Sequence, residues 1–285
     1  MVQNMKIHYL GTAAAERIPA TFCNCRVCRD AIRLGGKNIM TRSQVLLDDT
    51  LLVDLSTDTW QHFLAMGKTL ESVEHVLITH SHSDHFSVDE FILRGTGTAK
   101  DPTAGILNLY AGETVLGMIR DQLSRYSEEK RESIECRVEL HPIAYYTPFS
   151  VAGFTVTPLP AVHAGAEDAY IFLIEKNGKA LFYGNDTGVF SEEIDEYLAE
   201  NQKHIDLLSL DCTKGNQPYT YNHHMSMAEG RLIADRFFAK GILDSSSLLY
   251  YTHFSHNCQN THDELVEIAK DYGFSVTHDG FTLEI

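Results

Sequence analysis

Short runs of alternating or continuous apolar residues recur along the chain, and their lengths predict β-strands. Residues 43–56 predict a hairpin that turns at Asp48–Asp49, and residues 169–186 predict a second hairpin. The second turn contains Asn177–Gly178, a dipeptide that favours tight two-residue hairpin turns. Further strands are predicted over residues 5–12, 73–80, 105–112, 154–165, 205–211, 245–257 and 281–285.

Segments with helical periodicity lie between these strands. One of them has a clear start at Thr261, where Glu264 occupies the capping-box position for a helix over residues 261–273. Strands and helices alternate along the chain, which is typical of an α/β protein. No repeat, low-complexity segment or linker interrupts the sequence, so we expect one domain over residues 1–285. The other predicted helices cover residues 59–67, 88–95, 113–126, 191–202 and 226–241.

Polar side chains stand at the ends of five predicted strands. A single histidine or aspartate at such a position is usually a capping or hydrogen-bonding residue. Five of them along one α/β chain suggest a common rim, because loops that carry ligands converge where strands end. These residues are His80, His163, Asp186, Asp211 and His253.

The stretch THSHSDHF, residues 79–86, contains four potential metal ligands directly after a predicted buried strand. His80 and His82 are two residues apart, so on an extended segment they point the same way and can hold one ion. Asp84 and His85 follow at a turn into a helix and can face a second ion. Imidazole and carboxylate ligands suit zinc, iron or manganese. Two ions need more ligands, and Asp186 is the candidate bridge, with His163 and His253 completing the two sets.

This ligand series resembles that of the metallo-β-lactamase-fold hydrolases. Asp54, at the end of LLVD, is similar to an aspartate of that family that lies behind the ligands. The resemblance implies an α/β fold, a four-layer αββα sandwich with two divalent ions at one edge. By position, it assigns His80, His82 and His163 to the first ion, Asp84, His85 and His253 to the second, and Asp186 to both.

Two ions about 3.5–4 Å apart can form a bridging hydroxide and stabilise the leaving oxygen of a phosphoester. The expected activity is therefore hydrolysis without a covalent enzyme intermediate, and Asp84 is a catalytic candidate that can orient the water. We expect zinc or manganese, or else iron, as the native pair.

A second motif, CNCRVC, places Cys23, Cys25 and Cys28 within six residues. Ordinary buried thiols are one alternative, and a redox pair is another. The redox pair is disfavoured because the strand-to-helix context of a thioredoxin-type site is missing. Three thiolates in a tight loop favour a structural zinc that needs one more ligand. Disulfides are not expected in a reducing cytosol.

The segment YLGTAAAERIPATFCNCRVC is similar to the start of the phosphodiesterase branch of the carbon–phosphorus lyase pathway, whose members hydrolyse cyclic phosphates. The resemblance implies a structural zinc loop at about residues 19–30, with His256 as the fourth ligand. One departure is that GTAAAER keeps only Gly11 of that family's glycine-rich turn.

His223 and His224 precede a predicted helix in which Ser226 is the expected cap. In related phosphodiesterases a histidine at such a helix start lies near the scissile phosphate. We predict His224, rather than His223, as the catalytic proton donor. Exposed loop histidines are the alternative. Asp211–Cys212 is expected at the rim of the site, and His278–Asp279 forms either a supporting pair or a simple turn.

Charge narrows the expected partners. The chain has 23 Lys and Arg against 39 Asp and Glu, a net charge of −16, which disfavours a nucleic-acid partner. No apolar run reaches the roughly 18 residues of a membrane span, and the N-terminus does not resemble a signal peptide. We therefore expect a cytoplasmic enzyme acting on a small phosphate diester, with a homodimer as one option. The alternatives are a tRNA 3′-processing nuclease and a non-catalytic metal-binding protein of the same fold.

Overall fold

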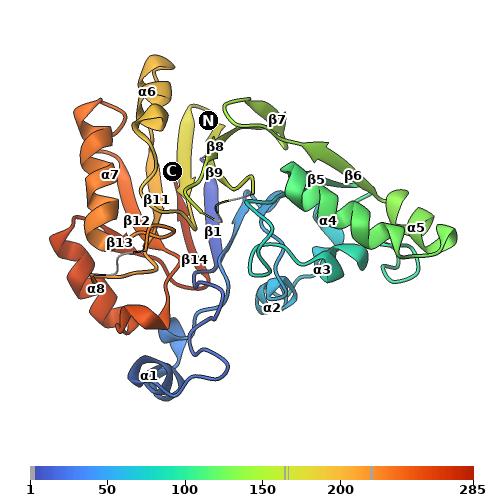
Figure 1. The fold of residues 1–285 in the computed structure, drawn as a ribbon, viewed down its shortest axis with the longest axis horizontal. Coiled ribbons are helices and arrows are strands. Elements are labelled where there is room, and N and C mark those ends of the chain that lie inside the picture. The colour runs from blue at the N-terminus through green and yellow to red at the C-terminus, as the bar shows by residue number, and fades with distance from the viewer. Residues whose placement is uncertain (1–3, 164, 166, 219–220) are drawn as a thin grey trace.

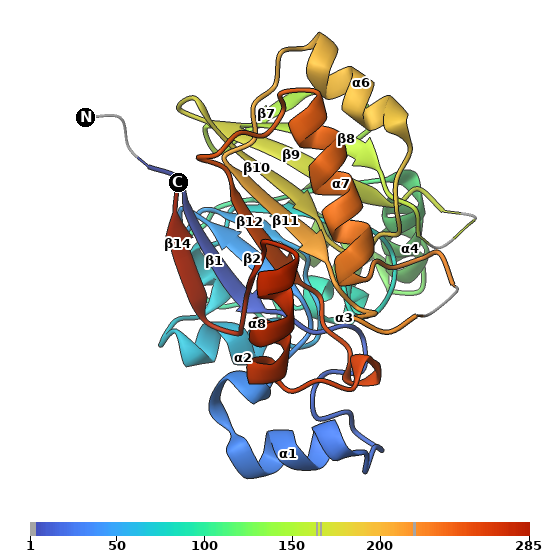
Figure 2. The ribbon, with the colours of Figure 1, turned by 90° about the vertical axis from the view of Figure 1, so that its left-hand side faces the viewer.

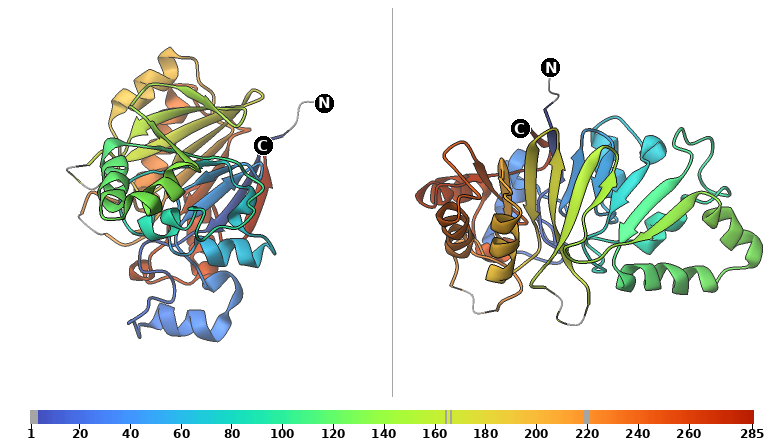
Figure 3. Two further views of the ribbon diagram at one scale, coloured as in Figure 1. Left: turned by 90° about the vertical axis from the view of Figure 1, so that its right-hand side faces the viewer. Right: turned by 90° about the horizontal axis from the view of Figure 1, so that it is seen from above.

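The computed structural model describes residues 4–163, 165, 167–218 and 221–285. Two seven-stranded mixed sheets face each other, with helices on both outer sides (Figures 1 and 3). This is the four-layer αββα sandwich that the resemblance implies, and the predicted fold class is confirmed. Not one helix within the described ranges has the length and apolar character needed to cross a membrane.

The first sheet pairs strands from the first half of the chain with the last strand. Its order is β14 (Phe281–Glu284), β1 (Lys6–Gly11), β2 (Gln44–Leu47), β3 (Leu51–Val53), β4 (His75–Leu77), β5 (Leu107–Ala111) and β6 (Val138–Pro142). The second sheet has the order β13 (Ser275–Val276), β12 (Leu248–Thr252), β11 (Leu207–Asp211), β10 (Lys179–Gly184), β9 (Tyr170–Lys176), β8 (Phe154–Pro160) and β7 (Phe149–Val151).

The helices divide between the two outer faces (Figures 1 and 2). Those of the first half cover the first sheet: α2 (Thr59–Ala65), α3 (Val88–Ile92), α4 (Glu113–Ser124) and α5 (Glu128–Glu135). Those of the second half cover the second sheet: α6 (Glu192–Glu200), α7 (Met227–Ala239) and α8 (His262–Asp271). Helix α1 (Arg26–Leu34) projects below the sandwich, next to the end of α8.

Both faces of the central strands are apolar because both are covered. In β10, Leu181 and Tyr183 face the other sheet, whereas Phe182 faces the helices and meets Phe237 of α7 at a ring-centroid distance of 5.4 Å. All of these side chains are buried. The sandwich therefore has one core between its sheets and one under each helical layer, and this holds the strand ends rigidly.

Parallel strands bring the predicted site residues to one edge. Strands β10, β11 and β12 run parallel to one another, as do β3 and β4, so the residues that follow them emerge side by side. Three of these residues have left-handed backbone: Asp54 (φ 72°), Asp186 (φ 49°) and His253 (φ 60°). Non-glycine residues adopt this conformation at a cost, and such strain collects at functional sites.

The secondary structure differs from the sequence prediction in several places. The strand predicted over residues 73–80 is shorter in the structure and consists of β4 alone. It ends before Thr79, whose N–H donates to Asp54 Oδ1 at 2.8 Å instead of to a neighbouring strand. The strand predicted to end at His163 ends three residues earlier, at Pro160. The prediction also missed α1, α5, β6, β7 and β13.

Candidate metal centre and active-site cavity

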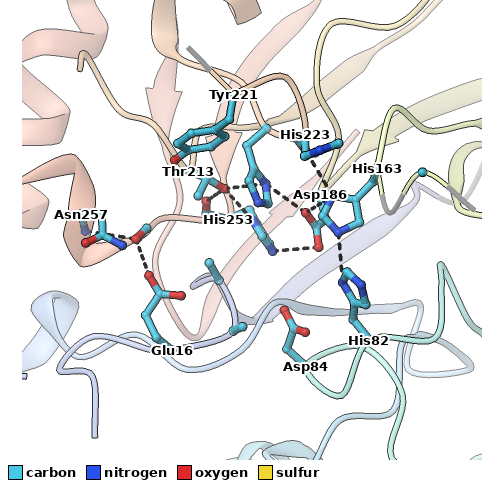
Figure 4. A pocket seen from close by; sticks show the side chains of 15 residues that line it. Glu16, His82, Asp84, His163, Asp186, Thr213, Tyr221, His223, His253 and Asn257 are labelled. Atoms are coloured by element: carbon cyan, nitrogen blue, oxygen red, sulfur yellow. Dashed lines mark hydrogen bonds and ion pairs between the residues drawn. The ribbon is translucent and has the colours of Figure 1, made fainter. Parts of the chain in front are cut away.

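The first predicted ligand set comes together at the strand ends. His80, His82, His163 and Asp186 each present a ligand atom, and these atoms all lie within 4.8 Å of one another. His80 Nε2 is 3.4 Å from Asp186 Oδ2, and His163 Nδ1 is 3.2 Å from Asp186 Oδ1. His82 Nδ1 lies 3.0 Å from His163 Nε2 on the open side of the cluster, as Figure 4 shows.

The second predicted set lies against the first. Asp84, His85, His253 and Asp186 also have ligand atoms within 4.8 Å of one another, and all four residues are buried. His85 Nε2 is 3.3 Å from Asp84 Oδ2 and 3.0 Å from Asp186 Oδ2, while His253 Nε2 is 3.7 Å from the same Asp186 oxygen. Asp186 therefore belongs to both clusters, the position that a bridging ligand requires.

The polar atoms at the centre of this arrangement fit a pair of divalent cations. Among the described residues, His80 Nε2, His85 Nε2, His253 Nε2 and Asp186 Oδ1 are buried and lack a partner with hydrogen-bond geometry. Buried polar atoms are normally satisfied, so three such nitrogens beside one such carboxylate oxygen indicate a shared partner. Imidazole nitrogens and a carboxylate oxygen are the donor set of zinc and manganese sites.

Side chains behind the ligands fix their orientation. His85 Nδ1 is 2.7 Å from Asp54 Oδ2, and the N–H and Oγ1 of Thr79 donate to the other Asp54 oxygen at 2.8 and 2.9 Å. This pairing places the proton of His85 on Nδ1 and directs Nε2 toward Asp186. Asp54 thus lies where the resemblance places it.

Thr213 and Asp211 hold His253 in the same way. His253 Nδ1 is 2.8 Å from Thr213 Oγ1 and 3.2 Å from Asp211 Oδ2, which leaves Nε2 facing Asp186. The sequence placed Asp211 at the rim, but it gave no signal for Thr213. A threonine two residues after a strand-end aspartate has no distinctive spacing.

Burial and neighbouring charges give His80 and Asp186 the protonation states that suit cation binding. Burial lowers the pKa of His80 well below its usual value, so the ring is neutral and its nitrogen lone pair is available. Burial opposes the ionisation of Asp186, but His253 and the other surrounding histidines hold the pKa of that carboxyl well below its usual value. A neutral imidazole beside an ionised carboxylate is the protonation state that ligation requires.

His223 and His224 both line the cavity, and the side chain of His224 contacts the acidic residues of the site. His224 Nδ1 is 3.0 Å from Asp186 Oδ1 and 3.1 Å from Asp211 Oδ2, and its side chain is 19% exposed. Burial opposes protonation, but Asp211 raises the pKa of His224 to about 10. His223 is exposed, and its carbonyl oxygen lies 3.1 Å from His163 Nδ1. The geometry therefore favours His224 as the proton donor.

Replacing His224 by glutamine should lower kcat by about 100-fold for a diester with an alkyl leaving group. The loss should be smaller for a p-nitrophenyl leaving group, because that group departs without full protonation. The matched control is His223→Gln, which should stay within a few-fold of the wild type. Equal losses with both leaving groups would argue against a proton-donor role for His224.

Five of the seven predicted metal ligands line an open cavity of about 560 Å³: His82, Asp84, His163, Asp186 and His253 (Figure 4). A cavity of this size suits a small ligand. Several of its lining residues were not predicted from sequence: Glu16, Thr213, Tyr221, Ser255 and Asn257. They come from three loops far apart in the chain, and no local pattern connects them. Asp84, His163 and His224 share the same wall.

The cysteine motif forms a second cluster about the N-terminus of α1. Ligand atoms of Cys23, Cys25, Cys28 and His256 lie within 4.8 Å of one another, and His256 Nδ1 is 3.5 Å from both Cys23 Sγ and Cys25 Sγ. The backbone N–H of Ala20 donates to Cys28 Sγ at 3.4 Å, and that of Cys28 donates to Cys25 Sγ at 3.5 Å. Three sulfurs and one imidazole are a tetrahedral zinc donor set.

The thiols of this cluster differ in acidity. Burial opposes the ionisation of Cys25, but hydrogen bonds from the Cys28 backbone and from His256 lower the pKa of its thiol to about 6. Burial raises the pKa of Cys28 to about 12. A cation bound here would have to displace the Cys28 proton, so its affinity should depend on pH.

The pair His278–Asp279 does not reach the cavity. Asp279 is instead an anchor for the N-terminal loop: it accepts hydrogen bonds from Thr12 Oγ1 at 2.8 Å and from the N–H of Thr41 at 2.7 Å. Despite these bonds, burial raises the pKa of Asp279 to about 6. The interpretation as a support for the metal site is therefore not favoured.

A pH-dependent cost to stability should follow from Asp279. The pKa of Asp279 in the folded protein lies above the unfolded value of about 3.9. The contribution of Asp279 to the free energy of unfolding should therefore fall by up to about 3 kcal/mol as pH rises from about 4 to 6, and then level off. Asp279→Asn cannot ionise, so its stability relative to wild type should rise across that window. Urea unfolding at each pH measures this difference. The control Asp263→Asn, at an exposed position, should follow the wild type; parallel Asp279→Asn and wild-type curves would contradict the prediction.

The fold and the clustered histidines define a protein of the metallo-β-lactamase class. Residues 49–254 match the family described as the Beta-lactamase superfamily domain, a range that contains both histidine clusters. The chain belongs to this superfamily, and the resemblance inferred from THSHSDH is confirmed.

Individual relatives extend the comparison. An octanoyltransferase of Porphyromonas gingivalis is 30% identical over 194 residues, which is 67% of this chain but only 37% of that protein. Among solved structures, a diphosphatase from the PhnP family has a TM-score of 0.75 at 21% identity, covering 99% of this chain and 98% of the other. Human tRNase Z, short form, has a TM-score of 0.62 at 15% identity, with 98% of both chains covered. At these identities the two structures show a shared fold.

Proposed function

We propose that the protein is a dinuclear metal-dependent phosphodiesterase that cleaves small or cyclic phosphate diesters. The observation that carries this proposal is the group of three histidine nitrogens and one Asp186 oxygen that are buried without hydrogen-bond geometry, beside an open cavity that Asp186 and His253 line. Zinc or manganese is the proposed pair, held by His80, His82 and His163 on one side and by Asp84, His85 and His253 on the other. Cys23, Cys25, Cys28 and His256 would hold a structural zinc.

Different residues of the chain would have different roles in hydrolysis. When bound, the two ions would lower the pKa of a water and stabilise charge on the phosphoryl oxygens. Asp84 lines the cavity and would orient the attacking water, whose oxygen forms the new bond to phosphorus. His224, protonated beside Asp211, would give its proton to the leaving oxygen as the old P–O bond breaks.

Phosphodiesters are favoured over other substrates by two observations. His224 is held in its charged form at the cavity wall, where an alkoxide leaving group needs an acid. The likeness to the PhnP-family diphosphatase extends over almost all of both chains. We further propose one domain over residues 1–285, a cytoplasmic location and a small-molecule partner, with homodimerisation as an open option.

The direct test is hydrolysis of bis(p-nitrophenyl) phosphate by the purified protein with manganese or zinc. We expect turnover that is abolished by a chelator and restored by the metal. Absence of turnover with every divalent ion tried would reject the proposal. Release of one p-nitrophenolate per diester, with no further release from the monoester product, would support diester specificity.

tRNA 3′ processing is a less favoured function, although tRNase Z shares the fold. The chain carries a net charge of −16, and the described residues that line the cavity include no lysine or arginine. Binding of a long polyanion depends on such cations. Cleavage of a tRNA precursor at a rate above that of the small diester would reverse this preference.

An acyl ester is a second candidate substrate class, suggested by the octanoyltransferase relative. The match covers 37% of that protein, so the name does not place the activity in the matched part. Hydrolysis of an octanoyl ester should be assayed beside the diester. A higher kcat/KM for the octanoyl ester would replace the phosphodiesterase proposal.

A further inference from the structure

The loop that departs from the glycine-rich pattern lies against the active-site rim. Ala13 forms a bridge with Phe254, and the N–H of Ala14 donates to the Phe254 carbonyl at 2.9 Å. Phe254 directly follows His253, so this pairing fixes the position of the loop relative to the ligand set that contains His253. The loop then lines the cavity with three consecutive residues, Ala14, Ala15 and Glu16, of which Glu16 carries the charge.

Glu16 is held in place by one oxygen of its carboxylate. Ser255 Oγ donates to Glu16 Oε1, and His256 Nε2 lies 3.8 Å from the same oxygen. Figure 4 shows the side chain across the cavity from Asp186, with its other oxygen directed toward the middle of the cavity. The side chain is 31% exposed and lines the cavity, so its carboxylate can contact a ligand there.

Glu16 places a carboxylate in the cavity wall that belongs to neither histidine cluster. Of the acidic residues described in the cavity wall, Asp84 and Asp186 belong to the ligand clusters, and Glu16 does not. The described lining contains no lysine or arginine that would neutralise it. A carboxylate in this position accepts hydrogen bonds from donors and repels a second negative charge.

We infer that Glu16 determines substrate specificity by accepting a hydrogen bond from a hydroxyl group next to the scissile phosphate, as in a sugar or glycerol phosphodiester. The inference rests on the proposed phosphodiesterase function and narrows its substrate class. The same carboxylate disfavours dianionic phosphate monoesters, because their additional negative charge would approach the negative charge of Glu16.

A matched pair of substrates tests this role. p-Nitrophenyl 2,3-dihydroxypropyl phosphate and p-nitrophenyl propyl phosphate have the same leaving group and charge and differ only in the two hydroxyls. The wild type should prefer the hydroxylated diester by about 10- to 100-fold in kcat/KM, the value of a hydrogen bond to a charged acceptor. In Glu16→Gln this preference should fall to within about 3-fold, mainly through KM.

A second measurement isolates the charge effect. Glu16→Gln should raise kcat/KM for p-nitrophenyl phosphate, a dianionic monoester, relative to the propyl diester. The control Glu128→Gln, on the exposed face of α5, should match the wild type in both measurements. The metal content and melting temperature of Glu16→Gln should also match the wild type.

The outcomes separate the two proposals. Equal kcat/KM for the two alkyl diesters in the wild type, or an unchanged preference in Glu16→Gln, would overturn the role of Glu16 while turnover itself upholds phosphodiesterase activity. Loss of metal from the cysteine cluster in Glu16→Gln would assign Glu16 a structural role and also overturn the inference. No turnover of any diester by the wild type would overturn both.

Discussion

Asp186→Asn is expected to lower kcat/KM for phosphodiesters by at least about 1,000-fold, because stabilisation by both metal ions depends on this one carboxylate. Its two oxygens lie within 3.0–3.7 Å of His80, His85, His163 and His253. Asparagine has a similar shape but lacks the charge that would balance two cations between neutral histidines. The variant should therefore fold and lose metal from the dinuclear site.

Steady-state kinetics and metal analysis of the same preparation measure both effects. Asp121→Asn, on the exposed side of α4, is the matched control and should keep full activity and metal content. Retention of both active-site metals with activity within about 10-fold of the wild type would contradict a bridging role for Asp186.

Cys25→Ser is expected to release one metal equivalent per chain and to destabilise the protein by about 4 kcal/mol, the mass-action value for a metal present at 1,000 times its dissociation constant. Cys25 is the N-cap of α1, and its sulfur lies 3.5 Å from His256 Nδ1. The cluster ties α1 to the loop that follows His253. Loss of the cation would free this attachment and expose the buried Cys28.

The exposed Cys136, at the end of α5, provides the control. Cys136→Ser removes a thiol without touching the cluster, so its metal content and melting temperature should equal those of the wild type. If Cys25→Ser also keeps its full metal content and melting temperature, the assignment of a zinc site to CNCRVC is wrong.

Local chemistry explains which elements were predictable. The hairpin at Asn177–Gly178 was predicted because both turn residues adopt positive φ, 54° and 77°, which asparagine and glycine tolerate. Helix α5, with the sequence EEKRESIE, was missed because Ile134 is its only buried residue and no apolar periodicity marks it. Helix α1 was missed because its first residues belong to CNCRVC, which was interpreted as a metal-binding loop.

The candidate site was predictable where its chemistry is local. The H-x-H-x-D-H spacing places four ligands in one turn, and the series of strand-end residues adds the remaining three. The αββα arrangement of the sheets came from the resemblance, since alternating strands and helices fit many α/β folds. Thr213 and Glu16 could not be predicted, because only the pairing of distant strands and loops brings them to His253 and Ser255.

Anomalous diffraction at the zinc and manganese absorption edges tests the central claim most directly. The account predicts two peaks about 3.5–4 Å apart on either side of Asp186 and a zinc peak among Cys23, Cys25, Cys28 and His256. A single peak among the histidines, or none, in crystals grown with both metals would contradict a dinuclear centre.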